Sequence, residues 1–372
     1  MYNVDTSWPA LRTSASTREI KDLAERISKS QSKLVDVARV AKVSTATVSR
    51  ALSNPQLVSD TARHRIDAAI QKLRYVPHGA ARALRSQRTR TIGAIVPTLG
   101  NAIFANYTQA LQKQLATRGY RLLLSCDEYD ARIEDTLVAP LIQHGVDGLV
   151  LVGRDHREAL FRAMKDHDIP YVLTWTSGTR GRHPCIGFDN AAAAARVAAF
   201  LLDLQHRHFA MIAGICKGND RARERVVGVR RALAASNIAL DPARVLQRPY
   251  TFAAGREAMH ALMQLKPRPT AVICGNDVLA VGAMAECRAI GIDVPRMVSV
   301  TGFDDMDIAS VVTPPLTTVR VPTDELGRAA ADYIVARIEG SPCAPLATMH
   351  VDIVVRGTVA RAGMEGPPKA AR

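Results

Sequence analysis

The chain has 372 residues and a formal net charge of +14, and most of that charge is concentrated at one end. Residues 1–90 contain 17 Lys+Arg and 7 Asp+Glu, whereas the remaining 282 residues contain 32 and 28. A basic charge confined to one small segment indicates a polyanionic partner such as nucleic acid. The sequence has no run of about 18 apolar residues and no basic amphipathic helix with aromatic anchors, which argues against a membrane protein.

The first 32 residues lack the charged-then-apolar pattern of a secretory signal, so we expect no export and a cytoplasmic location. Residues 17–29 could form a short amphipathic helix, but the segment is typical of a disordered extension, and we assign it no function. The cysteines are scattered, without a CxxC pair or a histidine at ligand spacing. They predict reduced thiols and no metal or cofactor: Cys126, Cys185, Cys216, Cys274, Cys287 and Cys343.

Residues 34–52 (LVDVARVAKVSTATVSRAL) predict two short helices joined by a tight turn. Apolar residues recur at helical spacing in the first helix, and Ser44 can cap the second, whose inner face holds Val48 and Leu52. The residues left facing outward are small, polar or cationic: Thr45, Ala46, Thr47, Ser49 and Arg50. Such a face suits the base edges and phosphates of a DNA major groove about 12 Å wide. The alternative is an ordinary helical hairpin with a solvated face.

A third amphipathic helix begins at Ser59, with Ile66, Ala69, Ile70 and Leu73 as its apolar stripe. After Pro77 comes the basic stretch HGAARALRSQRTR (78–90), which contains Arg82, Leu84, Arg85 and Arg88. It has too few apolar residues to form a helix alone. It could order on DNA, with Leu84 as an apolar wedge between base steps in the minor groove. The alternative is a basic linker.

The rest of the chain alternates between two patterns. Apolar, β-branched runs occur at 92–97, 120–126, 146–152, 169–175, 208–214, 271–275 and 298–303. Helical patterns lie between them, for example at 103–118, 190–205, 220–235 and 278–290. Such alternation predicts βαβ units and parallel sheets. About 265 residues are too many for one core, so we expect two lobes that divide near 188–190 and again near 320.

These segments together resemble the LacI/GalR family of bacterial transcription regulators over residues 33–356. The resemblance rests on VDVARVAKVSTATVSRAL, YVPHGAARALRS, IGAIVPTLGNAIFA, VDGLVLVG, CIGFDN, GNDVLAVGAM, VSVTGFDD and PPLTTVRVP, in this order. It implies an all-α helix-turn-helix headpiece followed by a two-lobed α/β domain like that of periplasmic binding proteins, with Rossmann-like lobes and parallel sheets. Thr45, Ala46 and Arg50 then occupy base-reading positions, and Leu84 the intercalating hinge position.

The resemblance also implies the boundaries of the domains. We expect an extension at 1–32, a headpiece at 33–77, a hinge at 78–90, an effector-binding and dimerisation domain at 91–357, and a tail at 358–372. The first lobe would comprise 91–189 and 323–348, and the second 190–320 and 349–357. Two positions depart from the family pattern. Lys42 replaces the usual turn glycine and would have to accept a positive φ, and His78-Gly79 replaces an asparagine-led hinge start, where glycine lowers helix propensity.

Polar and aromatic side chains gather at the expected carboxyl ends of strands, where open α/β sheets bind ligands. Asn276-Asp277 follows one strand, Asp304-Asp305 follows another, and Trp175 ends a third. An aromatic face beside hydrogen-bond acceptors suits a polyhydroxylated molecule. The family resemblance adds further effector-binding positions and assigns hydroxyl contacts to Asn276 and Asp304. The added positions are Arg225, Tyr250 as an aromatic wall, and Thr98, Asn101 and Phe104 on the first-lobe side. Trp175 stands where some relatives have aspartate.

Each of these residues has a structural alternative. Asn276-Asp277 can cap the helix that begins near Val278, and Asp305 can be a turn or cap residue. Arg225 can pair with Glu224 or Asp220 on a solvated helix, and Trp175 can serve packing alone. We expect His206 and His208 to be solvated turn residues rather than metal ligands.

Two other classes of protein fit the sequence poorly. An enzyme is disfavoured because there is no GxGxxG after the first strand, and no GxxxxGK[ST], GxSxG or HExxH. Strand-end carboxylates could act in a glycosidase, but no two form a distinctive pair, and a hydrolase has no use for the basic headpiece. A periplasmic sugar receptor would need a signal peptide and has no reason to carry residues 34–90.

We therefore predict a repressor that binds operator DNA as a homodimer under the control of a small effector. Two headpieces would read a near-palindromic site, since a two-fold dimer demands a two-fold site. An effector between the lobes would change their closure, and a coupling of about 1–3 kcal/mol would suffice for switching. HPCIGFDN and GAMAECRAIGIDVP resemble the gluconate-repressor branch, so the expected effector is a sugar acid, then a neutral sugar, then another metabolite. The C-terminal tail lacks leucine heptads, which favours a dimer over a tetramer.

Overall fold

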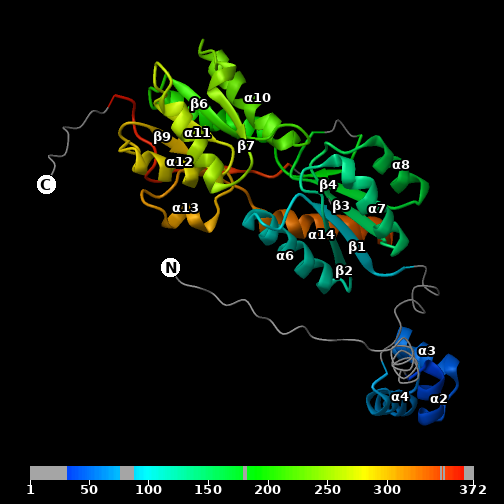
Figure 1. Ribbon diagram of the computed structural model, residues 1–372. Coiled ribbons are helices and arrows are strands. Elements are labelled where there is room, and N and C mark those ends of the chain that lie inside the picture. Colours follow the sequence, from blue (N-terminus) through cyan, green and yellow to red (C-terminus); the bar gives the residue numbers. More distant parts are fainter. Residues whose placement is uncertain (1–31, 76–87, 179–181, 344–345, 347, 364–372) are drawn as a thin grey trace, which may run out of the picture. The chain divides into compact units, whose positions relative to one another are not determined.

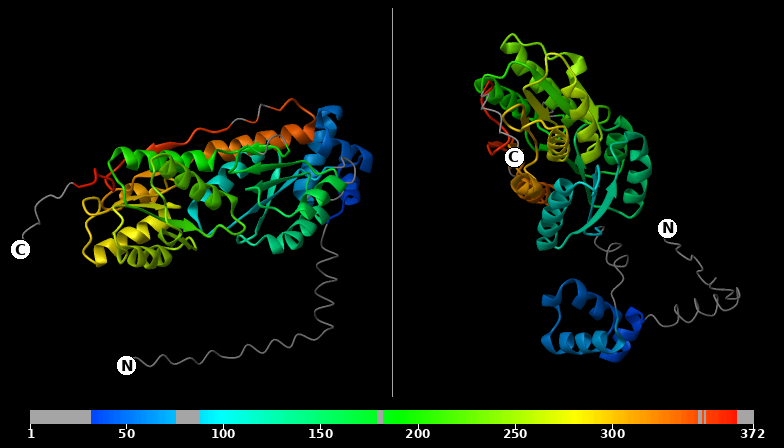
Figure 2. Two further views of the ribbon diagram at one scale, coloured as in Figure 1. Left: turned by 90° about the horizontal axis from the view of Figure 1, so that it is seen from above. Right: turned by 60° about the vertical axis from the view of Figure 1, so that its left-hand side comes forward.

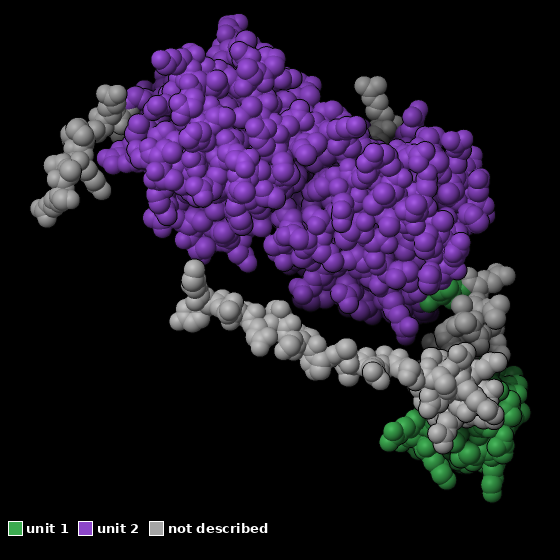
Figure 3. All heavy atoms as spheres, in the orientation of Figure 1, with its two compact units in different colours: residues 1–89 green, residues 90–372 purple. Residues whose placement is uncertain are grey.

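The computed structural model describes residues 32–75, 88–178, 182–343, 346 and 348–363. The chain divides into two compact units, residues 1–89 and residues 90–372, which are coloured separately in Figure 3.

The described part of the first unit is helical. It contains α2 (Leu34–Ala41), α3 (Thr45–Ser53), the 3₁₀ turn η1 (Pro55–Leu57) and α4 (Asp60–Leu73), drawn in blue in Figure 1. Val37, Val48 and Ile66 come from the three helices and are fully buried together, and Tyr75 closes the cluster. The three helices expected from the spacing of apolar residues are confirmed, and one small core holds them together.

Lys42 ends α2 in the left-handed conformation, with φ at 54° and ψ at 48°. The turn therefore has the geometry that the departure from glycine led us to expect. Its backbone N–H donates to the carbonyl of Arg39, and Val43 N–H donates to the carbonyl of Ala38, so the turn satisfies carbonyls at the helix end. The conformation is costly for a residue with a Cβ, by about 1–2 kcal/mol.

Replacing Lys42 with glycine is expected to stabilise the helical unit by about 1 kcal/mol, since glycine adopts positive φ without the Cβ clash. Thermal unfolding of the full chain, followed by circular dichroism, measures the effect. Lys33→Gly is the matched control, because Lys33 precedes α2 at a φ of −99°. A Lys42→Gly variant that is no more stable than Lys33→Gly would show that the turn is not strained.

The first lobe of the second unit is a parallel five-stranded sheet in the order β2-β1-β3-β4-β5. Helices α6 and α14 pack on one face, against Ile92, Val150 and Val172, and α7 and α8 on the other, against Leu149 and Leu173. The elements are β1 (Thr91–Val96), α6 (Ala102–Thr117), β2 (Arg121–Cys126), η2 (Ala131–Ile133), α7 (Glu134–Gln143), β3 (Gly148–Val152), α8 (Glu158–Asp166), β4 (Tyr171–Thr174), β5 (Cys185–Ile186) and α14 (Thr323–Glu339).

The second lobe is a parallel four-stranded sheet in the order β7-β6-β8-β9. Met211 and Ile273 face α9 and α10, whereas Ile212 and Val272 face α11 and α12. The elements are α9 (Asn190–Asp203), β6 (Phe209–Gly214), α10 (Asp220–Ala235), η3 (Pro242–Arg244), β7 (Val245–Arg248), α11 (Phe252–Met263), β8 (Ala271–Cys274), α12 (Asp277–Ala289), β9 (Ser299–Thr301) and α13 (Asp307–Val311).

The chain crosses between the lobes more than once. After β9 it forms β10 (Thr318–Arg320) and returns to the first lobe, where α14 packs along α6, as both views in Figure 2 allow the reader to follow. A later segment forms β11 (Asp352–Val354), which pairs with β10 in an antiparallel ribbon. The segment at β10 also runs parallel to the end of β9 and the residues after it, with bridges between Thr301 and Thr317 and between Asp304 and Arg320.

The seven strands expected from apolar runs all occur, and their positions confirm the prediction of two parallel sheets. Strands β5, β7, β10 and β11 were not predicted. They are two to four residues long, and β7 and β5 lie at sheet edges. Each has at most two buried residues, whereas the equally short β8 and β9 are buried throughout, so the four carry no apolar run that would mark a strand.

Candidate functional site

Six of the nine residues expected to contact DNA lie together on the short helix α3 and at its N-cap, Ser44. Ser44 caps it, because its hydroxyl accepts a 3.1 Å hydrogen bond from the backbone N–H of Thr47. Val48 faces the core of the unit, whereas Thr45, Ala46 and Arg50 are exposed and Thr47 and Ser49 are half-buried. No acidic residue lies in the first turn of α3. The helix therefore presents small, polar and cationic side chains to solvent. Arg82, Leu84 and Arg85 lie outside the described residues.

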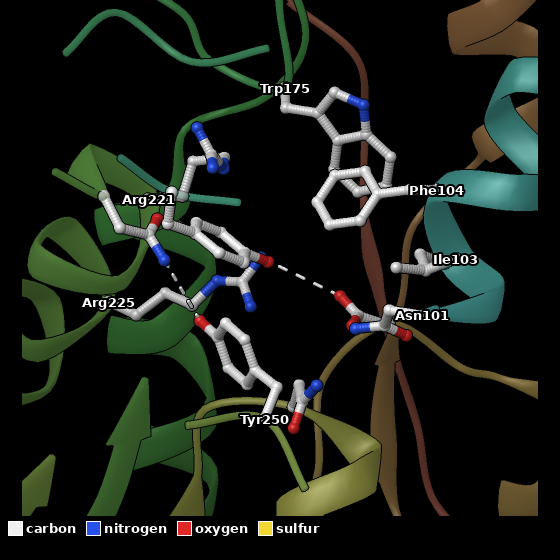
Figure 4. Close-up of a pocket in the computed structure, with 11 residues that line it drawn as sticks. Asn101, Ile103, Phe104, Trp175, Arg221, Arg225 and Tyr250 are labelled. Atoms are coloured by element: carbon white, nitrogen blue, oxygen red, sulfur yellow. Dashed lines mark hydrogen bonds and ion pairs between the residues drawn. The ribbon is translucent and has the colours of Figure 1, made fainter. Parts of the chain in front are cut away.

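A pocket between the lobes collects seven of the eight residues expected to bind an effector. Its side chains nearly fill it, since the cavity left among them measures about 20 Å³. Figure 4 shows Trp175 and Phe104 on one side of it and Arg225 and Tyr250 on the other. The expected residues that line it are Asn101, Phe104, Trp175, Arg225, Tyr250, Asn276 and Asp304; the four that were not expected are Ile103, Tyr129, Asn219 and Arg221.

Thr98, the eighth expected residue, does not line this pocket. Its hydroxyl accepts a 3.0 Å hydrogen bond from the backbone N–H of Gly100, two residues along the same loop. The loop leads into α6, whose first residues Ile103 and Phe104 do reach the pocket. Thr98 thus shapes the loop, and the structure gives it no contact with the pocket.

The aromatic wall of the pocket is built around Trp175, which follows β4 with a φ of 66° and is only 1% exposed. Its ring lies 5.0 Å from that of Phe104 and meets Tyr107 edge-on at 5.6 Å, both from α6. The indole therefore packs in the first lobe and also faces the pocket. The indole N–H has no hydrogen-bond partner among the described residues, which is unusual for a buried tryptophan.

Arg225 does not lie on a solvated helix face, which was its structural alternative. Its side chain is 7% exposed. Its Nε donates to Asn190 Oδ1 at 2.9 Å and its Nη1 to the carbonyl of Gly275 at 2.7 Å. The guanidinium lies 3.6 Å from the centroid of the Phe303 ring, a cation–π contact. The remaining nitrogen, Nη2, lies 3.8 Å from Asp304 Oδ1. Arg225 is therefore a structural residue as well as a pocket residue.

Asn276 combines the two roles that the sequence left open. Its Oδ1 accepts a 2.9 Å hydrogen bond from Leu279 N–H and so caps α12, while its Nδ2 has no partner among the described residues. The same holds for Asn101 Oδ1 across the pocket. Buried amide groups that lack partners are costly in a finished protein interior. These two atoms are suited to a ligand that supplies both a donor and an acceptor.

The acidic residues next to the pocket hold the crossing strands. Asp277 is fully buried and accepts hydrogen bonds from the Thr318 hydroxyl at 2.5 Å and from Met306 N–H at 2.7 Å. Asp305 pairs with Arg320 and Arg356, each at 2.7 Å. Thus Asn276 and Asp304 face the pocket, and the aspartate after each one binds the segment that joins the lobes. Asp305 is more than a turn residue.

Asp304 has an unusual electrostatic setting. Its φ is 114°, and burial raises the pKa of its carboxyl to about 7, although Arg225 and Arg221 pull it down. Burial and the nearby charge of Asp304 together raise the pKa of Asp277 to about 8. Two carboxyls with raised pKa values beside one pocket can thus exchange protons near neutral pH.

The replacement Asp304→Asn is expected to flatten the dependence of stability on pH. Because the pKa of Asp304 is raised on folding, the folded state holds a proton that the unfolded state releases, so its stabilising contribution is full below about pH 4 and is lost as the pH rises through about 7. The loss amounts to as much as about 4 kcal/mol. Chemical unfolding of both proteins between pH 4 and pH 7 measures it, and parallel profiles would show that Asp304 does not titrate there.

His206 contradicts our expectation of a solvated turn residue, because it is only 2% exposed. Its ring nitrogens contact the hydroxyls of Thr270 and Ser299 and the carbonyl of Ala360 at 3.0–3.1 Å. It thereby joins the start of β8, β9 and the C-terminal segment, and burial lowers its pKa. The hydrophilic sequence around it hid this tertiary role. His208 is exposed, as expected.

Among the residues that the structure describes, no group of three or more His, Cys, Asp or Glu side chains is arranged to hold a metal ion. Within the same residues, no helix has both the length and the apolar character needed to cross a bilayer.

Two features together define the class of protein. One is a small helical unit that exposes a polar and cationic helix; the other is a two-lobed α/β unit with a polar pocket that both lobes line. This combination is that of a ligand-responsive DNA-binding regulator. Comparison with known proteins agrees: residues 33–78 match bacterial regulatory proteins of the lacI family, and residues 198–359 match the periplasmic binding protein-like domain.

The transcriptional repressor CytR of Escherichia coli K12 is 32% identical over 325 residues, which are 87% of this chain and 95% of CytR. The ribose operon repressor of the same organism is 32% identical over 82% of this chain and 92% of its own length. A crystal structure of a lacI-family regulator from Silicibacter pomeroyi superimposes with a TM-score of 0.79 at 26% identity and covers 89% of this chain and all of that one. The chain belongs to the lacI family, and it is a DNA-binding transcriptional regulator.

Proposed function

We propose that this protein is a cytoplasmic repressor that binds a near-palindromic operator as a homodimer and responds to a small effector held between its lobes. The observation that carries the proposal is that the pocket takes side chains from both lobes, with Phe104 and Trp175 on one side and Arg225 and Tyr250 on the other. A ligand that contacts both lobes binds one relative position of the lobes better than another. It therefore shifts the equilibrium between them.

In this proposal α3 reads the DNA. Arg50, Thr45 and Ala46 contact base edges, and Ser44, Thr47 and Ser49 contact phosphates or bases. The cap at Ser44 supports this arrangement because the first turn of a helix offers backbone N–H groups and a positive dipole end to an anion. Arg82, Leu84 and Arg85 are proposed on the family resemblance alone to contact the adjacent minor groove and its phosphates.

The geometry of the pocket favours a neutral effector over the sugar acid that the sequence suggested. All three nitrogens of the Arg225 guanidinium already face a partner. Nε donates to Asn190, Nη1 donates to the carbonyl of Gly275, and Nη2 lies near Asp304. Arg221 is paired with Asp220 at 2.9 Å. A carboxylate would have to displace these partners to bind bidentately. The unsatisfied Asn101, Asn276 and Trp175 groups instead suit hydroxyl and carbonyl groups beside a ring that stacks on the aromatic wall.

Thermal unfolding in the presence of candidate ligands tests the proposal, since a ligand that binds the folded state raises the unfolding temperature. A panel would include neutral pentoses, hexoses and nucleosides. Each would be compared with the sugar acid that has the same number of carbon atoms as its sugar. We expect stabilisation by a neutral compound and none by its acid. A response to the acid alone would favour the sugar-acid effector. Stabilisation that persists in an Asn276→Ala variant would place the ligand elsewhere.

A further inference from the structure

We propose that ion pairs between the loop after β3 and the first turns of α10 form a latch that holds the two lobes together and makes their closure depend on salt. The latch consists of Arg154 and Asp155 in the first lobe and Arg223 and Glu224 in the second. The link between lobe closure and the effector response rests on the proposed function, whereas the ion pairs and their salt dependence do not. The latch itself can be tested without any effector.

The first half of the latch is a cation of the first lobe held by anions of the second. Arg154 Nη2 is ion-paired with Glu224 Oε1, and its Nε lies 3.9 Å from Asp220 Oδ2. The backbone N–H of Arg154 also donates to Asp220 Oδ2 at 3.2 Å. Asp220 is completely buried, so moving the lobes apart would remove partners from a buried carboxylate. That is an expensive change unless the group becomes hydrated.

The second half has the opposite polarity. Arg223 of the second lobe binds Asp155 of the first with two hydrogen bonds, from Nη1 to Oδ2 at 2.6 Å and from Nη2 to Oδ1 at 2.7 Å. A bidentate arginine–carboxylate pair fixes both distance and orientation. Because each lobe contributes one cation and one anion, both ion pairs form together only when the loop and the helix are aligned as they are here.

The latch is separate from the pocket but connected to it. Arg154, Asp155, Arg223 and Glu224 do not line the pocket. Asp220 connects the two sites, since it also holds Arg221 Nη1 at 2.9 Å, and the same nitrogen lies 3.3 Å from the Val152 carbonyl of the first lobe. Closing the latch therefore positions Arg221, which does line the pocket.

The exposure of these side chains sets how the latch responds to salt. The exposed fractions are 33% for Arg154, 19% for Glu224, 46% for Arg223 and 26% for Asp155. Ions can reach such half-exposed pairs, and the screening length falls from about 10 Å at 0.1 M salt to about 3 Å at 1 M. The apolar and aromatic contacts of the pocket do not weaken in this way. Closure should consequently loosen as salt increases.

Trp175 provides a direct reading of closure, because it is 1% exposed and lines the pocket. The chain has two tryptophans, Trp8 and Trp175, so the full chain with Trp8→Phe reports on Trp175 alone. Quenching of its fluorescence by acrylamide would be measured at NaCl concentrations from about 0.05 to 1 M, a range that spans the screening lengths given above. Three further variants are made in the same Trp8→Phe background. One is a double alanine variant that combines Arg154→Ala and Arg223→Ala. The second is a charge swap that combines Arg223→Asp and Asp155→Arg, and the third is the control Arg296→Ala.

We expect the quenching constant of the parent to rise about twofold with salt as closed molecules open. The double alanine variant should show the raised value already at low salt and little further response, and the charge swap should return toward the parent. Arg296→Ala should behave as the parent, because Arg296 pairs with Asp293 inside the second lobe. Circular dichroism checks that each variant is folded.

Equal quenching in the parent and a folded double alanine variant at every salt concentration would overturn the latch. So would a charge swap that stays as open as the double alanine variant. Neither result depends on an effector, whereas failure of the ligand panel above would leave these readings unchanged. The two proposals can therefore fail independently.

Discussion

Replacement of Arg50 by alanine is expected to weaken binding to an operator sequence selected from a random DNA pool by about 5- to 150-fold. This range corresponds to about 1–3 kcal/mol of lost base recognition. Arg50 is exposed on α3, two residues after the buried Val48 that fixes how the helix sits on its core. Alanine keeps the helix, so any loss of affinity reports on the arginine side chain itself. Fluorescence anisotropy with labelled operator measures it at fixed salt.

The control for this prediction is Arg65→Ala, which removes the same charge from α4, where Arg65 is also exposed. We expect it to lower the affinities for operator and for random DNA by the same small factor. Arg50→Ala should instead lower the ratio of the two affinities. If both variants reduced operator and random DNA binding equally, Arg50 would contribute charge alone, and base reading would have to come from other residues of α3.

Replacement of Arg225 by alanine is expected to abolish the effector response and to lower the unfolding free energy of the two-lobed unit by about 3 kcal/mol. The loss of stability follows because Asn190 Oδ1, the Gly275 carbonyl and Asp304 all lose a buried partner. Protonation limits the loss, since the pKa of Asp304, already raised by burial, would rise further without the guanidinium. The variant should therefore be least stable above neutral pH.

Operator binding by Arg225→Ala should remain measurable below its unfolding temperature, since α3, which we propose to read the DNA, belongs to the other compact unit. Arg231→Ala, at an exposed position on the same helix α10, should change neither stability nor response. Chemical unfolding at several pH values and operator binding with and without the stabilising ligand provide the readings. A normal effector response in Arg225→Ala would remove Arg225 from the effector site and leave it a purely structural role.

Much of the fold could be predicted from local patterns. The seven strands predicted from apolar runs, and the helices between them, are marked by patterns that tertiary contacts reinforce, as at β3, where all five residues are buried. The ribbon of β10 and β11 could not be predicted, because these three-residue segments are 31 residues apart and are strands only because they pair with each other. His206 shows the same limit. Its burial depends on Thr270, Ser299 and Ala360, which are remote in sequence.

The candidate site divides in the same way. Their positions at the ends of predicted strands were enough to predict Trp175, Asn276 and Asp304 as effector-binding residues. The prediction of Arg225, Tyr250, Asn101 and Phe104 came from the family resemblance. Asn219 could have been found, because it caps α10 after β6 as Asn276 caps α12 after β8. Tyr129 and Arg221 could not, since a loop after β2 and a buried pair with Asp220 bring them to the pocket. Their position follows from how the lobes meet, which no local pattern records.

The most direct measurement is selection of bound sequences from a random DNA pool by the full chain, followed by the salt dependence of binding to the selected sequence. We expect a near-palindrome, because a two-fold dimer reads two half-sites, and a steep fall in affinity with salt as phosphate contacts are screened. Enrichment of a single asymmetric half-site would contradict the dimer. Recovery of no sequence above random binding, with and without the stabilising ligand, would contradict the ligand-gated operator binding on which the whole account rests.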